Sequence, residues 1–428
     1  MKVLLLGSGG REHAIAFKIA ESPSLTELFI APGNPGTALL GRNVNLSLSD
    51  SAGILEFCRE NKIELVVVGP EQPLADGIAD LLREAGIKVF GPNKNAAVIE
   101  GEKSFSKNLM KKYSIPTAAF EVFLKEEYPK AVEYVKKSSF PLVIKADGLA
   151  AGKGVLICPD LKSALEGLED CFGRNVFGNA GSKVVIEEFM TGEEASIFAV
   201  TDGENYVILP SAQDHKRIYD GDEGKNTGGM GAYSPAPLVN DSLLKEAEEK
   251  IIAPTLAAMK NEGRTYNGCL YCGLMITPEG AKVVEFNCRF GDPETQAVLP
   301  LIEGDLLELF YSAASGKINK DSVKYSGGSA VCVVAASKGY PDAFEKGFEI
   351  SGLDSVDKET VKIFHAGTKL DKGKIVTSGG RVLGVTAVIK ENNLKACKEL
   401  AYNALTKISF GNIYYRTDIA DKGIKRQG

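Results

Sequence analysis

Short apolar runs alternate with helical patterns along the first hundred residues of the chain. The order is strand 3–6, a helix from Glu12, strand 28–30, helix 52–59, strand 65–68, helix 73–84 and strand 88–90. Strands that alternate with helices at this spacing are typical of a doubly wound parallel sheet. We therefore predict an N-terminal α/β region built on such a sheet.

Loops rich in glycine and proline follow the first three predicted strands, at residues 7–11, 31–36 and 69–73. In doubly wound sheets, ligands bind beyond the carboxyl ends of the strands. We expect these three loops to converge on one crevice.

The pattern changes at a proline break, residues 115–117, which ends a predicted helix over 101–113. The next elements are helix 128–137, strands 142–145 and 155–157, helix 161–171, strand 183–189, strands between 196 and 287 around helix 241–261, helix 305–315, strands 330–336 and 381–389, and helix 393–407. A polar, glycine-rich insert at 220–231 is expected to be a mobile loop or a ligand loop. We predict a multidomain α/β and α+β protein with boundaries at 1–103, 104–326 and 327–428, the last a small α+β domain.

Composition narrows the class of protein. A chain of 428 residues with 44% hydrophobic and 25% charged residues is expected to fold into several globular domains. The formal charge of −6 and the lack of a long basic run argue against binding to nucleic acid or anionic lipid. No apolar run is long enough for a membrane span or a signal peptide, so the expected compartment is the cytoplasm.

Eight sparse cysteines favour reduced thiols, and Cys269 and Cys272 lie in an apolar run that favours core packing over a zinc site.

Two glycine-rich loops have the composition of phosphate sites. The loop at 7–12 follows a strand and opens a helix, but Glu12 occupies the third position of the dinucleotide fingerprint, and Arg11 instead favours a small phosphorylated ligand. The loop at 148–154 follows Lys145 and contains Lys153, with spacing that excludes a Walker A motif. A tight turn and a plain hairpin loop remain as alternatives for the two loops.

The sharpest signal is the run Glu285-x-Asn287-x-Arg289. Side chains alternate along a strand, so these three should share one face, while Val284, Phe286 and Cys288 point into the core. A carboxylate and an amide oxygen suit Mg²⁺, and the arginine suits an anion that the metal orients. The alternative is an edge strand with a solvated polar face.

Two further charged segments allow both a functional and a solvated interpretation. The acids of the strand end at 184–195 are suited to hydrogen bonds with adenine and ribose, although glutamates on turns are commonly solvated. The run at 213–217 contains Asp214, His215 and Lys216. An exposed charge cluster is the default interpretation there, and His215 lacks an evident partner as a base.

Taken together, these motifs resemble the ATP-grasp ligases. The motifs at 7–13, 31–36, 213–217, 226–231 and 289–294 are similar to those of the phosphoribosylamine-glycine ligase family. The resemblance implies a ligase that joins glycine to 5-phosphoribosylamine with ATP, through a glycyl phosphate, in purine biosynthesis. It also implies a central ATP-grasp fold of two α+β subdomains, with a mobile B subdomain at about 118–190, and a monomer or weak dimer.

The resemblance also implies roles for individual residues. The ATP contacts are Lys103, Lys145 and Gly152 for the phosphates, Glu187 and Phe189 for adenine, and Glu194 for the ribose. The metal ligands for Mg²⁺ or Mn²⁺ are Glu285 and Asn287, and the catalytic residues are Arg289 and Asp214. The substrate contacts are Gly9, Arg11, Asn34, Glu71, Asp76 and Lys216. Residues 272–276 supply no acid, so a second Mg²⁺ would be held mostly by phosphates and water.

Three other functions remain as alternatives. A biotin-carboxylase-like enzyme would share the layout but is opposed by Arg11 and the 289–294 signature. A nucleotide-binding module without catalysis would not need the Glu285, Asn287 and Arg289 set. A nicotinamide oxidoreductase is opposed by the failed fingerprint at Glu12.

Overall fold

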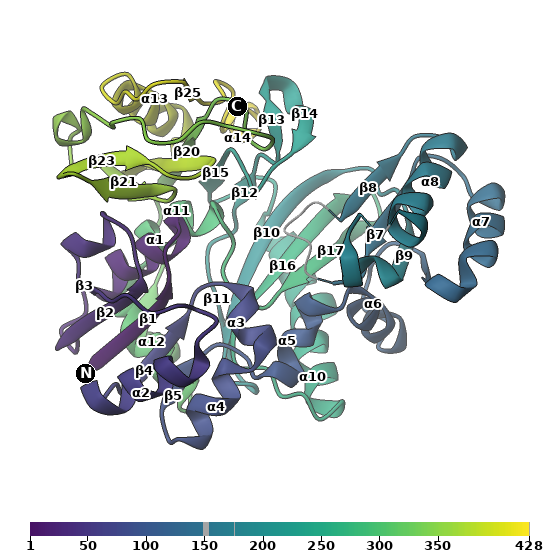
Figure 1. Ribbon diagram of the computed structural model, residues 1–428, viewed down its shortest axis with the longest axis horizontal. Coiled ribbons are helices and arrows are strands. Elements are labelled where there is room, and N and C mark those ends of the chain that lie inside the picture. Colours follow the sequence, from purple (N-terminus) through teal and green to yellow (C-terminus); the bar gives the residue numbers. More distant parts are fainter. Residues whose placement is uncertain (149–153, 175, 428) are drawn as a thin grey trace.

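The computed structural model describes residues 1–148, 154–174 and 176–427 (Figure 1). Its N-terminal region is a five-stranded parallel sheet of order β3-β2-β1-β4-β5, which confirms the predicted doubly wound sheet. The strands are β1 (Lys2–Gly7), β2 (Glu27–Pro32), β3 (Arg42–Asn43), β4 (Leu65–Val68) and β5 (Lys88–Phe90). Leu4 and Leu6 belong to one core cluster and Val3 and Leu5 to another, so β1 is buried on both faces.

The helices around this sheet are α1 (Gly10–Ile19), α2 (Ser51–Asn61), α3 (Glu71–Asp76), α4 (Ile78–Glu84), α5 (Lys94–Gly101) and α6 (Lys103–Lys112). Two predicted helices have different bounds in the structure. Gly77 adopts φ 98° between α3 and α4, and because a left-handed residue cannot continue an α-helix, the helix predicted over 73–84 is two. Glu102 is extended between α5 and α6, so the helix predicted over 101–113 corresponds to α6, whereas α5 was not predicted.

A four-stranded antiparallel sheet of order β6-β9-β7-β8 forms a separate lobe, the B lobe. It contains β6 (Phe120–Leu124), β7 (Leu142–Ala146), β8 (Val155–Cys158) and β9 (Lys183–Glu188), with α7 (Tyr128–Lys137) and α8 (Leu161–Leu168). Figure 1 shows both helices on the outer side of the lobe. Its apolar residues form a core cluster of their own, as expected for an α+β unit.

The central sheet has the order β11-β10-β16-β17. Its elements are β10 (Glu193–Thr201), β11 (Tyr206–Ile208), β16 (Gly268–Thr277), β17 (Gly280–Asn287), α9 (Asp241–Ala247) and α10 (Ala253–Asn261), followed by α11 (Glu294–Val298), α12 (Leu306–Ala314), β18 (Glu303–Gly304) and β19 (Val323–Lys324). Cys272 joins one core cluster and Cys269 the other, so they face opposite sides of β16. All eight cysteines are buried and free, which confirms core packing.

The C-terminal sheet has the order β12-β15-β20-β24-β21, and β25 also pairs with β20. Its elements are β12 (Gln213–Asp214), β15 (Gly231–Ser234), β20 (Ser329–Ser337), β21 (Val361–His365), β24 (Arg381–Ile389), β25 (Ile413–Tyr414), α13 (Leu394–Leu405) and α14 (Asp421–Gln427), with a hairpin of β22 (Thr368–Asp371) and β23 (Lys374–Thr377). Two of its strands, β12 and β15, come from the central part of the chain. In the part of the chain that the structure describes, no helix is both long and apolar enough to cross a membrane.

Candidate active site

A cavity of about 590 Å³ lies where the B lobe, the central sheet and the C-terminal sheet meet. Most of the residues predicted from the sequence line it. They are Arg11, Glu71, Lys103, Lys145, Glu187, Phe189, Glu194, Asp214, Lys216, Glu285, Asn287 and Arg289. The fold therefore gathers residues from across the first 289 positions around one space. Of the three N-terminal loops expected to share a crevice, those at 7–11 and 69–73 reach the described lining through Arg11 and Glu71, whereas no residue of 31–36 does.

Three predicted substrate contacts are absent from the described cavity lining. The Asn34 amide donates to the carbonyls of Ser8 and His365, at 2.9 Å each, and ties two loops together. The Gly9 N–H donates to Glu12 Oε2 at 2.7 Å. Asp76 is exposed on α3 and accepts from Gln72. Gly152 and Lys153 lie outside the described residues, so all of these contacts stay predictions.

Glu187, at the end of β9, is held by two buried lysines. Its carboxylate forms ion pairs with Lys107 Nζ at 2.9 Å and Lys145 Nζ at 3.0 Å. Burial lowers the pKa of Lys107 to about 8, although Glu187 opposes the shift. An adenine contact by Glu187 would have to compete with these pairs. Sequence reasoning missed Lys107 because α6 has the lysine-rich pattern of a solvated helix.

Lys103 opens α6 and reaches the end of β7. Its ammonium donates to the Gly148 carbonyl at 2.7 Å, and Asp147 accepts from the Ser104 N–H at 3.0 Å. Lys145 donates to the Val284 carbonyl at 3.1 Å. These contacts place both predicted phosphate-binding ammonium groups on the cavity wall.

A β-bulge shapes the strand that carries the predicted metal ligands. In the ladder with β16, Glu285 pairs with Gly273 and Val283 with Leu274, so Val284 is the extra residue. Val283 is buried in the core, whereas Val284 lines the cavity. The predicted inward position of Val284 is therefore wrong. Beyond the bulge the prediction holds, because Phe286 and Cys288 join the core while Glu285 faces the cavity.

Glu285 and Asn287 present oxygen atoms to this space. Among the described residues, the Glu285 carboxylate has no hydrogen-bond or ion-pair partner within reach. Burial would raise its pKa, but the cations Lys216, Lys145, Arg289 and Lys103 lower it below the usual value. The Asn287 amide nitrogen is best placed toward Glu100 Oε1 (3.1 Å) and the Phe286 carbonyl (3.2 Å), which leaves its oxygen available. An unpaired carboxylate beside an amide oxygen fits a hard cation.

Arg289 is already paired within the protein. Its Nε lies 3.2 Å from Glu71 and its Nη2 lies 3.0 Å from Glu100. Burial, aided by Glu71 and opposed by Arg289, raises the pKa of Glu100, whereas Arg289 and Arg11 outweigh burial and lower that of Glu71. Arg289 is thus fixed in place before any anion arrives.

The segment 213–217 is not an exposed charge cluster, because Gln213 and His215 are buried. Lys216 forms a close ion pair with Glu194 and lies 3.9 Å from Asp214. Burial, with help from Glu294, Glu194 and Glu285, raises the pKa of Asp214 to about 7 against the effect of Lys216.

His215 is a poor candidate for a catalytic base. Its ring packs beside Tyr233, and neither ring nitrogen has a hydrogen-bond partner among the described residues. Burial and the nearby Arg416 and Lys422 lower its pKa to about 4, so the imidazole is neutral. Among the residues that the structure describes, none is hydrogen-bonded to this imidazole to exchange a proton with it.

The C-terminal region closes the cavity through residues that the sequence did not indicate. Arg381 donates to the Asp292 carbonyl at 2.9 Å and pairs with its carboxylate at 3.0 Å. Arg381 also donates to the Gly228 carbonyl, while the Tyr340 hydroxyl accepts from the Gly228 N–H at 2.9 Å. These partners are too far apart in sequence for any local pattern to connect them.

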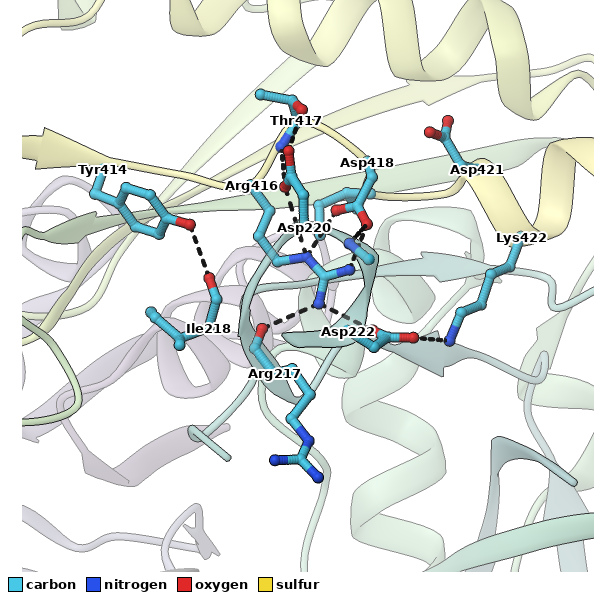
Figure 2. A network of polar contacts seen from close by, with 12 residues as sticks. Arg217, Ile218, Asp220, Asp222, Tyr414, Arg416, Thr417, Asp418, Asp421 and Lys422 are labelled. Carbon is cyan, nitrogen blue, oxygen red and sulfur yellow. Dashed lines mark hydrogen bonds and ion pairs between the residues drawn. The ribbon is translucent and has the colours of Figure 1, made fainter. Parts of the chain in front are cut away.

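The glycine-rich insert begins in the turn of a hairpin of β13 (Arg217–Tyr219) and β14 (Glu223–Asn226), and this turn, Asp220–Asp222, is anchored to the C-terminal segment (Figure 2). The side chain of Arg416 is fully buried, pairs with Asp222 at 3.0 Å and Asp418 at 2.6 Å, and donates to the Arg217 carbonyl at 3.0 Å. Lys422 also pairs with Asp222. The insert is therefore tied to the C-terminal segment on one side, while its end at 226–228 lines the cavity.

Family models match nearly the whole chain. They are the N domain (residues 1–100), the ATP-grasp domain (101–295) and the C domain (330–422) of phosphoribosylglycinamide synthetase. The chain belongs to the phosphoribosylglycinamide synthetase family. It is 49% identical to the phosphoribosylamine-glycine ligase of Caldanaerobacter subterraneus subsp. tengcongensis, over 98% of this chain and 99% of that one. It is also 49% identical to that of Neisseria meningitidis, over the full length of both.

Solved structures agree with this membership of the synthetase family. The phosphoribosylamine-glycine ligase of Thermotoga maritima matches with a TM-score of 0.84 and 38% identity, over 98% of this chain and 100% of that one. The biotin carboxylase of Campylobacter jejuni matches with a TM-score of 0.72 and 13% identity, over 98% of each chain. At that identity the second match shows a common fold alone, as expected for an ATP-grasp protein.

Proposed function

We propose that this chain joins glycine to 5-phosphoribosylamine and converts ATP to ADP and phosphate in purine biosynthesis. A glycine carboxylate oxygen attacks the γ-phosphorus of ATP and ADP leaves, which gives glycyl phosphate. The amine nitrogen of phosphoribosylamine then attacks the acyl carbon, phosphate leaves, and glycinamide ribonucleotide forms. Family membership and the named relatives support this reaction.

One observation about the site carries the proposal. Lys103 and Lys145, the unpaired carboxylate of Glu285 and the amide of Asn287 face the same cavity as Arg11 of the N-terminal sheet. Ammonium groups suit ATP phosphates, and a guanidinium suits a substrate phosphate. Such a site acts mainly by position and charge.

Glu285 and Asn287 would hold Mg²⁺ or Mn²⁺, which when bound would neutralise part of the phosphate charge. Phe189 lines the cavity with 40% of its surface exposed, and is suited to stack on adenine. Lys216 and Asp214 would face the bound glycine substrate, and the Lys216 ammonium would lie beside the carboxylate of that glycine. Arg289, held by Glu71 and Glu100, would offer a fixed positive charge to the acyl phosphate.

The test of this reaction is ADP release from purified protein with Mg-ATP and freshly made phosphoribosylamine. Glycine, no amino acid, and bicarbonate are compared as the acid substrate. We expect release only when glycine and the amine are both present. Bicarbonate-dependent release would favour the biotin-carboxylase-like alternative, and ATP binding without turnover would favour a binding module.

Other parts of the proposal stay predictions. They are the domain boundaries at residues 103 and 326, a B subdomain at about 118–190 that moves, a monomer or weak dimer, and a cytoplasmic location. The separate core of the B lobe supports its independence as a unit.

A further inference from the structure

Glu100, near the end of α5, contacts three consecutive residues at the end of β17. Its Oε2 accepts from the Cys288 N–H at 2.7 Å. Its Oε1 lies 3.0 Å from Arg289 Nη2 and 3.1 Å from the Asn287 amide nitrogen. The Glu100 side chain is only 7% exposed, although it lines the cavity. One carboxylate therefore binds a backbone group, a guanidinium and a side-chain amide of the candidate site.

We propose that Glu100 is a positioning residue that fixes the Asn287 amide with its oxygen toward the cation. This inference rests on the metal site proposed above and adds the group that orients one ligand. The two ends of an amide have nearly the same size, so packing cannot choose between them. Hydrogen bonds must make that choice.

The contacts around Asn287 all favour one orientation. Glu100 already accepts on both oxygens, from Arg289 on Oε1 and from the Cys288 N–H on Oε2, so it meets the Asn287 amide as an acceptor that favours the nitrogen and repels the oxygen. The Phe286 carbonyl, 3.2 Å from the same nitrogen, is also an acceptor. The reversed amide would face two acceptors with its oxygen and would point N–H donors at the cation. Glu100, a residue of α5, thus determines that the oxygen of the Asn287 amide, and not its nitrogen, faces the cation.

Glu71 provides a matched control. It also pairs with Arg289, at 3.2 Å, and it also lines the cavity. Within the described part of the chain, it has no hydrogen bond to Asn287 or to the Cys288 backbone. Glu71→Gln therefore perturbs Arg289 and removes a carboxylate while it leaves the Asn287 amide in place.

The experiment is a Mn²⁺ titration of the full-length protein, followed by electron paramagnetic resonance, without turnover. We expect Glu100→Gln to weaken Mn²⁺ binding by about 10- to 100-fold, the usual loss when a group that supports a metal ligand is removed. We expect Glu71→Gln to change it by less than about threefold. Equal affinity in Glu100→Gln and wild type would overturn the inference.

A second pair of variants separates orientation from a general structural effect. Aspartate at position 287 has an oxygen at both ends, so its orientation no longer matters. Glu100 can only repel either oxygen of that aspartate, so Glu100→Gln in the Asn287→Asp background should leave Mn²⁺ affinity unchanged or raise it, even if Glu100→Gln alone folds poorly. A 10- to 100-fold loss in that background would overturn the inference.

The proposed metal site is tested in the same titration. Wild-type protein should bind Mn²⁺, and Glu285→Gln should abolish that binding. No binding by the wild type, or full binding by Glu285→Gln, would overturn the metal site and with it the role of Glu100. Normal behaviour of both, with no effect of Glu100→Gln, would overturn only the role of Glu100.

Discussion

The side chains of Arg289 and Arg416 are 18% and 0% exposed, and each forms ion pairs with two or more carboxylates. The surroundings of the two arginines nevertheless differ. Arg289 pairs with Glu71 and Glu100 on the wall of the cavity. Arg416 pairs with Asp222, in the turn of a hairpin, and with Asp418, outside the described cavity lining (Figure 2). A buried ion cluster is therefore not by itself a sign of a ligand site.

The neighbours of each cluster make the difference. Beside Arg289, the Glu285 carboxylate has no partner among the described residues, and the Asn287 oxygen is left available. Beside Arg416, Asp222 also pairs with Lys422, and Asp418 accepts from the Gly221 N–H. Only the first cluster keeps unused acceptors beside a cavity. The first should therefore govern turnover and the second stability.

The largest expected effect is on turnover, from the variant Glu285→Gln. We expect the rate of ADP release to fall by about a hundred- to a thousandfold, because a charged group at the reacting centre is removed. The melting temperature should stay the same or fall only slightly, because no described residue loses a hydrogen bond or ion pair, although the cations that lower the pKa of Glu285 lose one anion. Steady-state kinetics and thermal melts measure the two effects. Parallel loss of activity and stability would make Glu285 a structural residue.

The variant Arg416→Met, in the second cluster, should affect stability rather than turnover. The variant loses the hydrogen bonds of a buried guanidinium to Asp222, Asp418 and the Arg217 carbonyl. Asp222 keeps its pair with Lys422 and both carboxylates are partly exposed, so we expect the free energy of unfolding to fall by about 1.5–3 kcal/mol. The rate of ADP release, measured where the variant is folded, should fall by less than about tenfold. Denaturant unfolding and kinetics check this pair of effects. A stable variant with a collapse of turnover would place Arg416 in the chemistry instead.

The pH dependence of the melting temperature tests the charge on Asp214, which lines the cavity. Its raised pKa means that the folded state binds the proton more tightly than the unfolded state, so its contribution to stability falls as pH rises through about 4 to 7. Asparagine does not titrate. The melting temperature of Asp214→Asn, relative to wild type, should therefore rise by about 2 °C between pH 5 and pH 8. A relative fall would mean that attraction to Lys216 outweighs the cost of burial.

The smallest expected effect comes from Lys225→Met in β14 of the same hairpin. Lys225 pairs with Asp342 at 2.8 Å, but both side chains are more than 60% exposed. Exposed pairs contribute little, so the free energy of unfolding should change by about 0.5 kcal/mol or less. Denaturant unfolding compares it with Arg416→Met. Similar losses in the two variants would show that the exposed pair in β14 holds the insert as firmly as the turn that Arg416 binds.

The N-terminal fold was predictable because its central strands are buried on both faces. Residues 3–6 and 65–68 form continuous apolar runs, and the structure places β1 and β4 at those positions. The break at Gly77 was missed because backbone conformation at one residue leaves no apolar period. Short strands such as β6 and β25 were missed because their pairing is set by distant partners.

The candidate site was predictable where one strand carries it. Alternation placed Glu285 on the ligand face, but the bulge at Val284 could not be seen in the sequence. The roles of Glu100, Lys107 and Arg381 depend on contacts with residues 80 to 190 positions away. Such contacts exist only after the domains have assembled.

The most direct test of the ligase is a single turnover with glycine labelled by ¹⁸O in both carboxylate oxygens. Attack of the carboxylate on ATP, followed by displacement of phosphate, transfers one labelled oxygen to inorganic phosphate. We predict one ¹⁸O in each phosphate formed, with the other in glycinamide ribonucleotide. Phosphate without label, or ADP formed without glycine, would contradict the account.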